Sequence, residues 1–282
     1  MIAEPPLPPG KNGHLPDEDI PAASDPLDYV SVSRLKSFLG CRLRFYFEKV
    51  IGLPRPLSPS LHFGRAVHAG LQHYNLARWR AGDTSEPAVI AAYQKAFDNP
   101  EKGQEVTFDS AEDKAELRAK GEPLLKAFLA TQLVASDIKP EGVELKLRAE
   151  LPALALPLLG VIDLVKADHC SVDYKTIAAT PDLKLETWLH DLQLTAYTLL
   201  VEEATGERSP GNELVFLVKT KTPKVIVHTV PPPKQVQRDR FARLVETYAT
   251  GVANEDYFPS PGQACAWCSY RSECSAWKGG AL

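Results

Sequence analysis

GVIDLVKADHCSVDYKT, residues 160–176, consists of two short apolar runs joined by a polar turn. Val, Ile and Leu alternate with polar residues on both sides of the turn, as they do in half-buried strands. Asp163, Asp173 and Lys175 interrupt these runs, where a charge is costly unless it is paired. The stretch therefore predicts a β-hairpin whose charged residues have a chemical purpose.

A metal-dependent hydrolytic site would explain these charges. Mg²⁺ sites use one or two carboxylates together with water and phosphate oxygens, and Asp163 and Asp173 on neighbouring strands can converge on one ion. Lys175 follows Asp173 by two residues, so both side chains emerge on the same strand face. A lysine there can polarise a metal-bound water and balance charge in the transition state. An Asp–Lys pair on an exposed sheet face is the alternative, which the apolar neighbours of Asp163 disfavour.

The hydrophobic pattern predicts the remaining elements. Helical spacing occurs in 29–40, 41–53, 61–82, 86–97, 110–133, 183–206 and 234–254, and alternation marks strands in 142–151, 156–168, 170–176, 212–220 and 224–230. Ser31 or Ser33 can cap the first helix. Helices, three strands, a helix, two strands and a helix predict a mixed α/β core behind a helical preface.

Composition limits the class of protein. The chain has 282 residues, 44% hydrophobic and 24% charged, and a net charge of −4, which is ordinary for a globular protein. No apolar run approaches the roughly 20 residues of a membrane span, and no secretory signal is recognisable, so we expect a cytoplasmic protein without a membrane partner. Residues 1–28 contain seven prolines and six acidic residues against one lysine, which predicts a disordered tail.

The cysteines indicate a metal or cluster site. Cys265, Cys268 and Cys274 form C-x(2)-C-x(5)-C near the C-terminus, and Cys41 and Cys170 complete an odd total of five. An odd number in a cytosolic chain argues against a disulfide framework. Three thiolates need a fourth ligand to complete a zinc site or an iron–sulfur cluster.

Four segments carry recognisable motifs: GVIDLV…VDYKT, FGRAVHAGL, DLQLTAYTLL and SVSRLKSFLGCRLRFYFEKVIGL. Together they resemble the PD-(D/E)XK nuclease superfamily, and specifically its RecB-like branch. In that family they correspond to the catalytic core, the helix with a histidine ligand, the Q-x-x-x-Y helix and the N-terminal helix with a cysteine. The resemblance extends from about residue 29 to 275. Each motif is weak alone, but their joint occurrence in this order is specific.

The resemblance implies a restriction-endonuclease-like α/β fold, with a mixed sheet flanked by helices and an N-terminal helical lobe stapled to the C-terminal tail. We expect a single nuclease domain over 29–282, comprising a helical lobe (about 29–138), a catalytic core (about 139–255) and the cysteine cluster (264–275). Mg²⁺ or Mn²⁺ would be held by His68, Asp163 and Asp173. Lys175, Gln193, Tyr197 and Glu144 would be the catalytic residues.

Each assignment has a structural alternative. A lone His68 on a helix is more often packed or on the surface than a ligand. Gln193 and Tyr197 are four residues apart and share a helix face, but Tyr197 could pack in the core while Gln193 caps a carbonyl. Glu150 competes with Glu144, and either could belong to a solvated strand face.

For the cysteines, the resemblance implies a [4Fe–4S] cluster held by Cys41, Cys265, Cys268 and Cys274, as in the AddB and CRISPR adaptation nucleases. Zinc with the same four thiols is the alternative. We expect Cys170 to pack as a small apolar residue.

A basic segment is the candidate surface for nucleic acid. Residues 34–55 hold six basic residues and one acid, with four interleaved aromatic residues. Basic groups bind phosphate, and aromatic rings can stack on unpaired bases, although these rings could equally form the buried face of the helix. Arg42, Arg44 and Arg65 are the candidate DNA contacts.

We therefore expect a metal-dependent DNA exonuclease that acts on single strands or DNA ends in recombination, repair or CRISPR adaptation. The alternative is a non-catalytic or partner-dependent DNA-binding module, with a helicase or a CRISPR integrase as the possible partner. A zinc-stapled structural protein with incidental acids would require an accidental match at four separate motifs.

Overall fold

The computed structural model describes residues 25–100, 104–131, 133 and 138–279. Its helices are α1 (Val32–Gly40), α2 (Arg42–Phe45) with the π-helical turn η2 (Tyr46–Val50), α3 (Pro59–Ala77), α4 (Glu86–Asp98), α5 (Ala111–Ala119), α6 (Gly121–Ala130), α7 (Leu183–Thr205), α8 (Gln235–Ala253), the 3₁₀ turn η3 (Gln263–Trp267) and α9 (Arg271–Ala276). Its strands are β1 (Val30–Ser31), β2 (Gly142–Ala149), β3 (Leu158–Val165), β4 (Ser171–Ile177), β5 (Asn212–Val218) and β6 (Lys224–Val230). The predicted order of elements is confirmed, except that the single helix expected over 110–133 is divided into α5 and α6; β1, η3 and α9 are additions.

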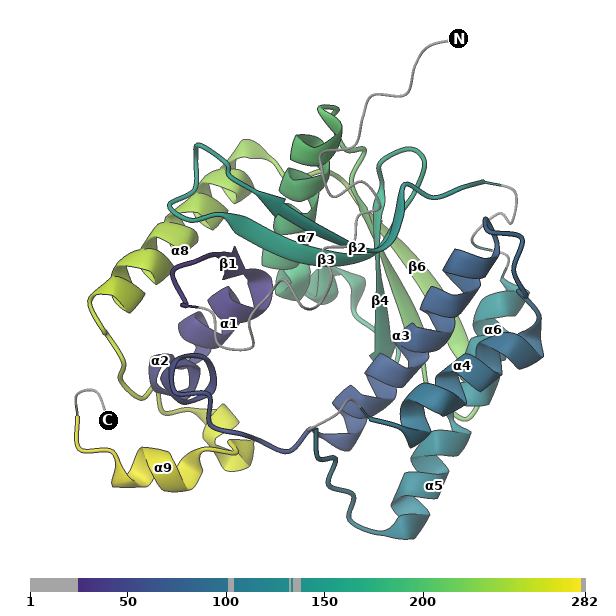
Figure 1. Ribbon diagram of the computed structural model, residues 1–282, viewed down its shortest axis with the longest axis horizontal. Coiled ribbons are helices and arrows are strands. Elements are labelled where there is room, and N and C mark those ends of the chain that lie inside the picture. Colours follow the sequence, from purple (N-terminus) through teal and green to yellow (C-terminus); the bar gives the residue numbers. More distant parts are fainter. Residues whose placement is uncertain (1–24, 101–103, 132, 134–137, 280–282) are drawn as a thin grey trace.

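The strands form one six-stranded mixed sheet. β2–β3, β3–β4 and β5–β6 are antiparallel, whereas β1–β3 and β4–β5 are parallel. The α7 helix provides the long crossover between the parallel strands β4 and β5 (Figure 1). This is the mixed α/β sheet flanked by helices that the sequence predicted.

One edge of β3 is divided between two strands. β2 pairs with β3 along its whole length, from Leu158 to Val165. On the other edge, β1 pairs with Leu158 and Leu159, and β4 pairs with Leu164 and Val165. Within the described residues, no strand ladder covers this edge between Gly160 and Asp163. The sheet therefore has an opening beside Asp163.

Helices cover both faces of the sheet (Figure 1). Residues of α3, α4 and α6 pack on one face, against side chains such as Tyr174 and Leu217. α7 packs on the other face, where Leu194 contacts the group of Leu214 and Phe216. Because successive side chains on a strand alternate between faces, Asp173 and Lys175 lie on the α7 face, opposite to Tyr174.

The C-terminal tail packs on the N-terminal helices. Tyr270 is buried with Leu43, Tyr46 and Phe47, and its hydroxyl donates a 3.0 Å hydrogen bond to the Leu53 carbonyl. α9 and α2 accordingly lie beside one another in Figure 1. The expected contact between tail and helical lobe is present.

The first helix begins as predicted, with the Ser31 hydroxyl accepting from the Arg34 N–H. The expected disordered tail falls mostly on residues 1–24, which lie outside the described residues. Asp25 and Pro26, which we placed in that tail, instead accept hydrogen bonds from the Arg34 guanidinium. In the part of the chain that the structure describes, no helix is long and apolar enough to cross a bilayer.

Candidate active site

The opening in the sheet is filled by side chains that bind the backbone of β4. The Tyr174 N–H donates to Asp163 Oδ2 at 2.8 Å, and its carbonyl accepts from His68 Nε2 at 2.9 Å. Both backbone groups point towards β3, where a strand partner would otherwise satisfy them. Asp163 and His68 thus complete the hydrogen bonding of β4 and are fixed in position by it.

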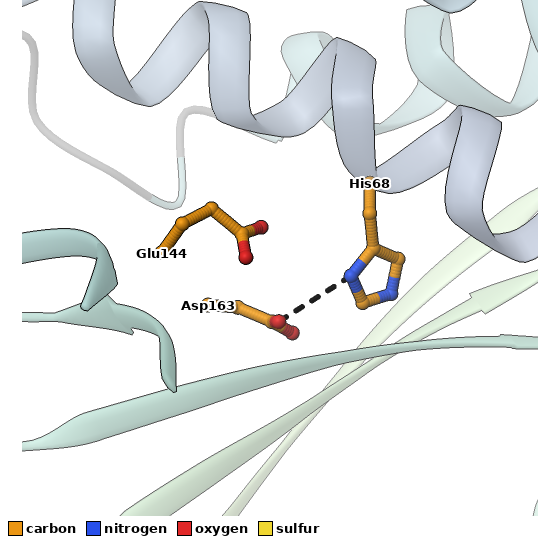
Figure 2. Close-up of side chains that lie close together, drawn as sticks. All are labelled: His68, Glu144 and Asp163. Carbon is orange, nitrogen blue, oxygen red and sulfur yellow. Dashed lines mark ion pairs between the residues drawn. The ribbon is translucent and has the colours of Figure 1, made fainter. Parts of the chain in front are cut away.

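These contacts also orient the His68 ring and, when the imidazole is neutral, fix its tautomer. A carbonyl can only accept, so Nε2 carries a proton, and Nδ1 points at Asp163 Oδ1 from 3.3 Å (Figure 2). Burial disfavours the imidazolium, but the Asp163 carboxylate outweighs it and raises the pKa of His68 to about 9. Burial likewise opposes ionisation of Asp163, whereas His68 and the Tyr174 N–H hold the pKa of that carboxyl below its usual range. An imidazole whose distal N–H binds a carbonyl has the usual orientation of a metal ligand.

Glu144 of β2 joins this pair from the opposite strand. The pairs Val143–Leu164 and Leu145–Ile162 place Glu144 directly across from Asp163. Ligand atoms of His68, Glu144 and Asp163 all lie within 4.8 Å of one another (Figure 2). Burial and the nearby Asp163 charge raise the pKa of Glu144 to about 7.

The backbone of Glu144 is unusual, with φ of 50°. A non-glycine residue with positive φ is uncommon and stores strain, often at functional sites. The strand is interrupted in this way at the residue whose side chain reaches the acidic group. Glu150, the competing candidate, lies beyond the end of β2 and is exposed.

Asp173 and Lys175 form an ion pair beside Asp163. Lys175 Nζ lies 2.7 Å from Asp173 Oδ2, and Asp173 is only 3% exposed. Burial raises the pKa of Asp173, Lys175 lowers it and Asp163 raises it again, with a net result of about 6. Apart from this ion pair, Asp173 Oδ2 has no hydrogen-bond donor among the described residues.

Gln193 connects the ion pair to α7. Its Nε2 donates to Asp173 Oδ1 at 2.9 Å and to the Tyr197 hydroxyl at 2.8 Å, and its Oε1 accepts from Lys175 at 3.2 Å. Tyr197 is 6% exposed and packs with Ile162, and burial raises its pKa well above the usual value. The structure therefore brings Gln193 and Tyr197 to the acidic group as part of a buried network.

Sequence reasoning missed two residues beside this network. The Lys36 ammonium donates to the Leu189 carbonyl at 2.9 Å, and burial followed by repulsion from Lys175 lowers its pKa. Burial, with Lys175 and Lys36, lowers the pKa of His190 to about 4, so this imidazole is neutral. The basic segment signalled Lys36, but nothing in the spacing showed that it reaches α7.

The chemistry of this donor set fits a divalent cation. One imidazole nitrogen and several carboxylate oxygens converge, and the mixture suits Mn²⁺ at least as well as Mg²⁺. The raised pKa values of Glu144 and Asp173 reflect burial and crowding of negative charge. The buried Asp173 Oδ2 still has acceptor capacity. A bound cation would relieve the repulsion and use that capacity.

The four predicted cluster cysteines gather away from this site. Cys41, Cys265, Cys268 and Cys274 line one cavity of about 200 Å³ between α2 and the C-terminal tail. The fifth cysteine, Cys170, is buried in the core, as we expected, and burial raises the pKa of its thiol to about 12. The structure thus separates four thiols from the fifth.

The predicted nucleic-acid contacts are spread over several surroundings. Arg42 forms a 3.4 Å ion pair with Asp256 and lies over the rings of Phe38 and Phe258. Arg44 lines the cysteine cavity, and Arg65 donates to Gln104. The aromatic residues of the basic segment, Phe38, Phe45, Tyr46 and Phe47, are all buried, so the packing alternative holds for them.

One family model matches this chain, and one solved structure agrees with its fold. The model of the PD-(D/E)XK nuclease superfamily matches residues 29–275. A crystal structure from Eubacterium rectale, described as a "Putative exonuclease", superposes with a TM-score of 0.61 at 17% identity, covering 95% of each chain. The structure of SSO0001 gives a TM-score of 0.36 at 11% identity, over 86% of this chain and 93% of that one. No curated protein matches.

Proposed function

Because the chain belongs to the PD-(D/E)XK nuclease superfamily, we propose that it is a divalent-metal-dependent deoxyribonuclease. The observation that carries this proposal is the convergence of His68, Glu144 and Asp163 beside the Asp173–Lys175 pair. Such a site combines an acidic group for a cation with a lysine for the developing negative charge of a phosphodiester.

The ion would be held by His68, Glu144 and Asp163, whose ligand atoms lie within 4.8 Å of one another. Asp173, which the sequence predicted as the third ligand, lies beside this group and would be a further oxygen donor. When bound, a divalent ion supplies activation of water and neutralisation of phosphate charge. The Asp163 and His68 side chains are held for this task by the backbone of Tyr174. Their geometry is therefore set before any ligand arrives, which lowers the cost of binding.

Lys175 is suited to hold the reacting phosphate and stabilise its charge. It is the partly exposed member of the Asp173–Lys175 pair, so its ammonium can also meet a substrate. Gln193 fixes both groups through hydrogen bonds, and Tyr197 fixes Gln193. Gln193 and Tyr197 would thus act mainly as positioning residues, through Lys175 and Asp173.

The test is degradation of labelled single-stranded DNA by purified protein with Mn²⁺, beside Lys175→Ala and the control Lys221→Met. Lys221 is exposed on the loop between β5 and β6. We expect the wild type and the control to cut and Lys175→Ala to lose at least about 10²-fold in rate. Equal degradation by all three proteins, or degradation by none, would contradict catalysis at this site. Tight DNA binding without cutting would favour a binding module.

Exonuclease action on single strands or DNA ends is the finer part of the proposal. The name given to the Eubacterium rectale structure supports it, since that fold covers 95% of both chains. Assignment to the RecB-like branch adds recombination, repair or CRISPR adaptation as contexts, with a helicase or an integrase as partner. Circular single-stranded DNA tests this part: an exonuclease degrades the linear form and leaves the circle intact.

A [4Fe–4S] cluster on the four gathered cysteines is the second part of the proposal. The four thiols line one cavity, which supports a shared metal or cluster site. The resemblance to nucleases that hold a cluster on four such cysteines favours iron and sulfide, and zinc held by the same four thiols is the alternative.

Visible absorption of anaerobically purified protein tests this assignment. We expect a broad band near roughly 400 nm, where thiolate-bound clusters absorb. Cys41→Ser should lose the band, whereas Cys170→Ser, which changes a cysteine far from the cavity, should keep it. A colourless protein containing stoichiometric zinc would overturn the cluster.

A further inference from the structure

The first turns of α7 present an apolar face to solvent. Leu185, Trp188 and Leu189 are 52%, 65% and 52% exposed. Their i, i+3, i+4 spacing puts them on one helix face. Leu189 lies one turn before Gln193, so the Leu189 side of this face leads along α7 towards the candidate active site, while Trp188 lies on the side next to α8.

The ring of Trp188 is contacted from one side by α8. The Arg240 guanidinium of α8 lies 5.1 Å from the centre of its indole ring. Arg240 is itself fixed by a 2.6 Å ion pair with the buried Asp191, which also accepts from Gln237. The ring is therefore braced by a cation on one side while most of its surface is open, as a stacking platform requires.

One ammonium group lies beside this platform, that of Lys36, and a second belongs to the acidic site, that of Lys175. Lys36 reaches from α1 to the Leu189 carbonyl, and it is near enough to Lys175 for the two charges to repel. Among the residues that the structure describes, no carboxylate lies within ion-pair distance of Lys36. Positive charge gathered in this way complements the phosphates of a strand that passes from Trp188 to Lys175.

We propose that Trp188 and Lys36 form an entry track for single-stranded DNA, in which Trp188 stacks on an unpaired base and Lys36 binds a phosphate. The inference rests on the proposed nuclease function and names its substrate as an unpaired strand. Five residues separate Trp188 from Gln193, about 7.5 Å along the helix axis and about 140° around it. A strand that stacks on Trp188 would therefore cross the exposed Leu189 to reach the site, a path of at least about two nucleotides at about 3.4 Å each.

Unpaired DNA fits this track better than a duplex. A duplex hides the faces of its bases, whereas a single strand offers them to an aromatic ring. The aromatic surface of Trp188 and the ammonium group of Lys36 also match a single strand of DNA, which carries bases on one side and phosphates on the other. A protein partner that docks on this face would require only an apolar side chain at position 188, whereas stacking on a base requires an aromatic ring.

Fluorescence anisotropy with labelled oligo(dT) and with a duplex of equal length, in EDTA, tests the track without cleavage. We compare wild type, Trp188→Phe and Trp188→Leu. We expect Trp188→Leu to weaken binding of oligo(dT) about tenfold, and Trp188→Phe to stay within about threefold, because only a ring can stack. Duplex binding should change less than about twofold. Trp188 is exposed, so these variants should fold, which the melting temperature checks.

Salt dependence tests the phosphate contact. Lys36→Met should reduce the slope of log K against log salt for oligo(dT) by about 0.7, the value for one phosphate contact on a single strand. Lys221→Met should leave the slope unchanged. Binding of oligo(dT) that is unchanged by Trp188→Leu would overturn the track, as would equal loss on duplex. An absence of cleavage with Mn²⁺ would overturn the nuclease proposal instead, since binding is measured without metal.

Discussion

Replacement of Gln193 by leucine tests whether the buried network positions the catalytic groups. Leucine has a similar volume but makes none of the three hydrogen bonds that Gln193 shares with Asp173, Lys175 and Tyr197. Lys175 keeps its ion pair with Asp173 Oδ2. The principal losses are therefore the donor to Asp173 Oδ1 and the donor to the Tyr197 hydroxyl.

The structure sets the size of the effect. Asp173 and Tyr197 are 3% and 6% exposed, so water cannot readily replace the missing donor. A buried polar group without its partner costs about 1–3 kcal/mol, and more when it is charged. Leucine offsets part of this loss by about 1 kcal/mol of apolar burial. We expect Gln193→Leu to lower the free energy of unfolding by about 2–3 kcal/mol.

Urea unfolding in EDTA, followed by circular dichroism, measures this change. Gln235→Leu is the matched control, because Gln235 is exposed and its side chain bonds only to Asp239 among the described residues. It should change the free energy of unfolding by less than about 0.5 kcal/mol. An equally small change for Gln193→Leu would refute the view that its hydrogen bonds support the site.

Catalysis gives a second readout for the same variant. With Lys175 and Asp173 no longer held by Gln193, single-turnover cleavage with Mn²⁺ should slow about 10²-fold, the scale of a misplacement near 1 Å. The assay is run at a temperature where both proteins are fully folded. A destabilised variant that cuts at the wild-type rate would show that Gln193 supports the fold alone.

Three further outcomes are expected. Mn²⁺ at 100 times its Kd should stabilise the wild type by about 2.7 kcal/mol, seen as a rise in melting temperature that EDTA reverses. Asp163→Asn should abolish this rise, whereas the control Asp239→Asn, at an exposed position, should keep it. Gly121→Ala should lower the free energy of unfolding in urea by about 2 kcal/mol, because a Cβ there would overlap the Tyr93 ring; an unchanged midpoint would contradict this packing. Burial opposes ionisation of Glu202, but the ion pair with Arg238 of α8 holds the pKa of Glu202 below its usual value. The ion pair therefore stabilises the fold fully above about pH 4.3, and this stabilisation is lost as pH falls through the pKa of Glu202 in the folded protein. The melting temperature of Glu202→Gln should therefore fall less steeply than that of the wild type as the pH is lowered into the acid range.

The order of helices and strands was predictable because local periodicity determines it. Alternation in 170–176 and helical spacing in 183–206 follow from which faces are buried, and both elements are observed. The strand β1 could not be predicted, because its two residues are too few to show an alternating pattern. The proximity of His68 to Asp163 could not be predicted from sequence periodicity, because it depends on how α3 crosses the opening in the sheet.

Residues of the candidate site differ in how far the sequence could place them. Asp173 and Lys175 are two apart on one strand, so their pairing follows from strand geometry. Gln193 and Tyr197 are four apart on one helix, so their hydrogen bond follows similarly. Lys36 lies 139 residues before Lys175, and only the tertiary structure brings their charges together.

Glu144 shows why a site of this kind is hard to recognise from alternation alone. On a regular antiparallel pair, Glu144 and Asp163 would be two carboxylates facing each other across the strands, which is destabilising. The positive φ of Glu144 and the absence of a β4 ladder beside Asp163 break that regularity on both sides. Sheet pairing is thus incomplete at the point where acids crowd together, and a bound cation would relieve the repulsion that results. The fold uses Asp163 to satisfy the Tyr174 N–H, but it gains nothing from crowding the Glu144 carboxylate against Asp163, which a bound cation would account for.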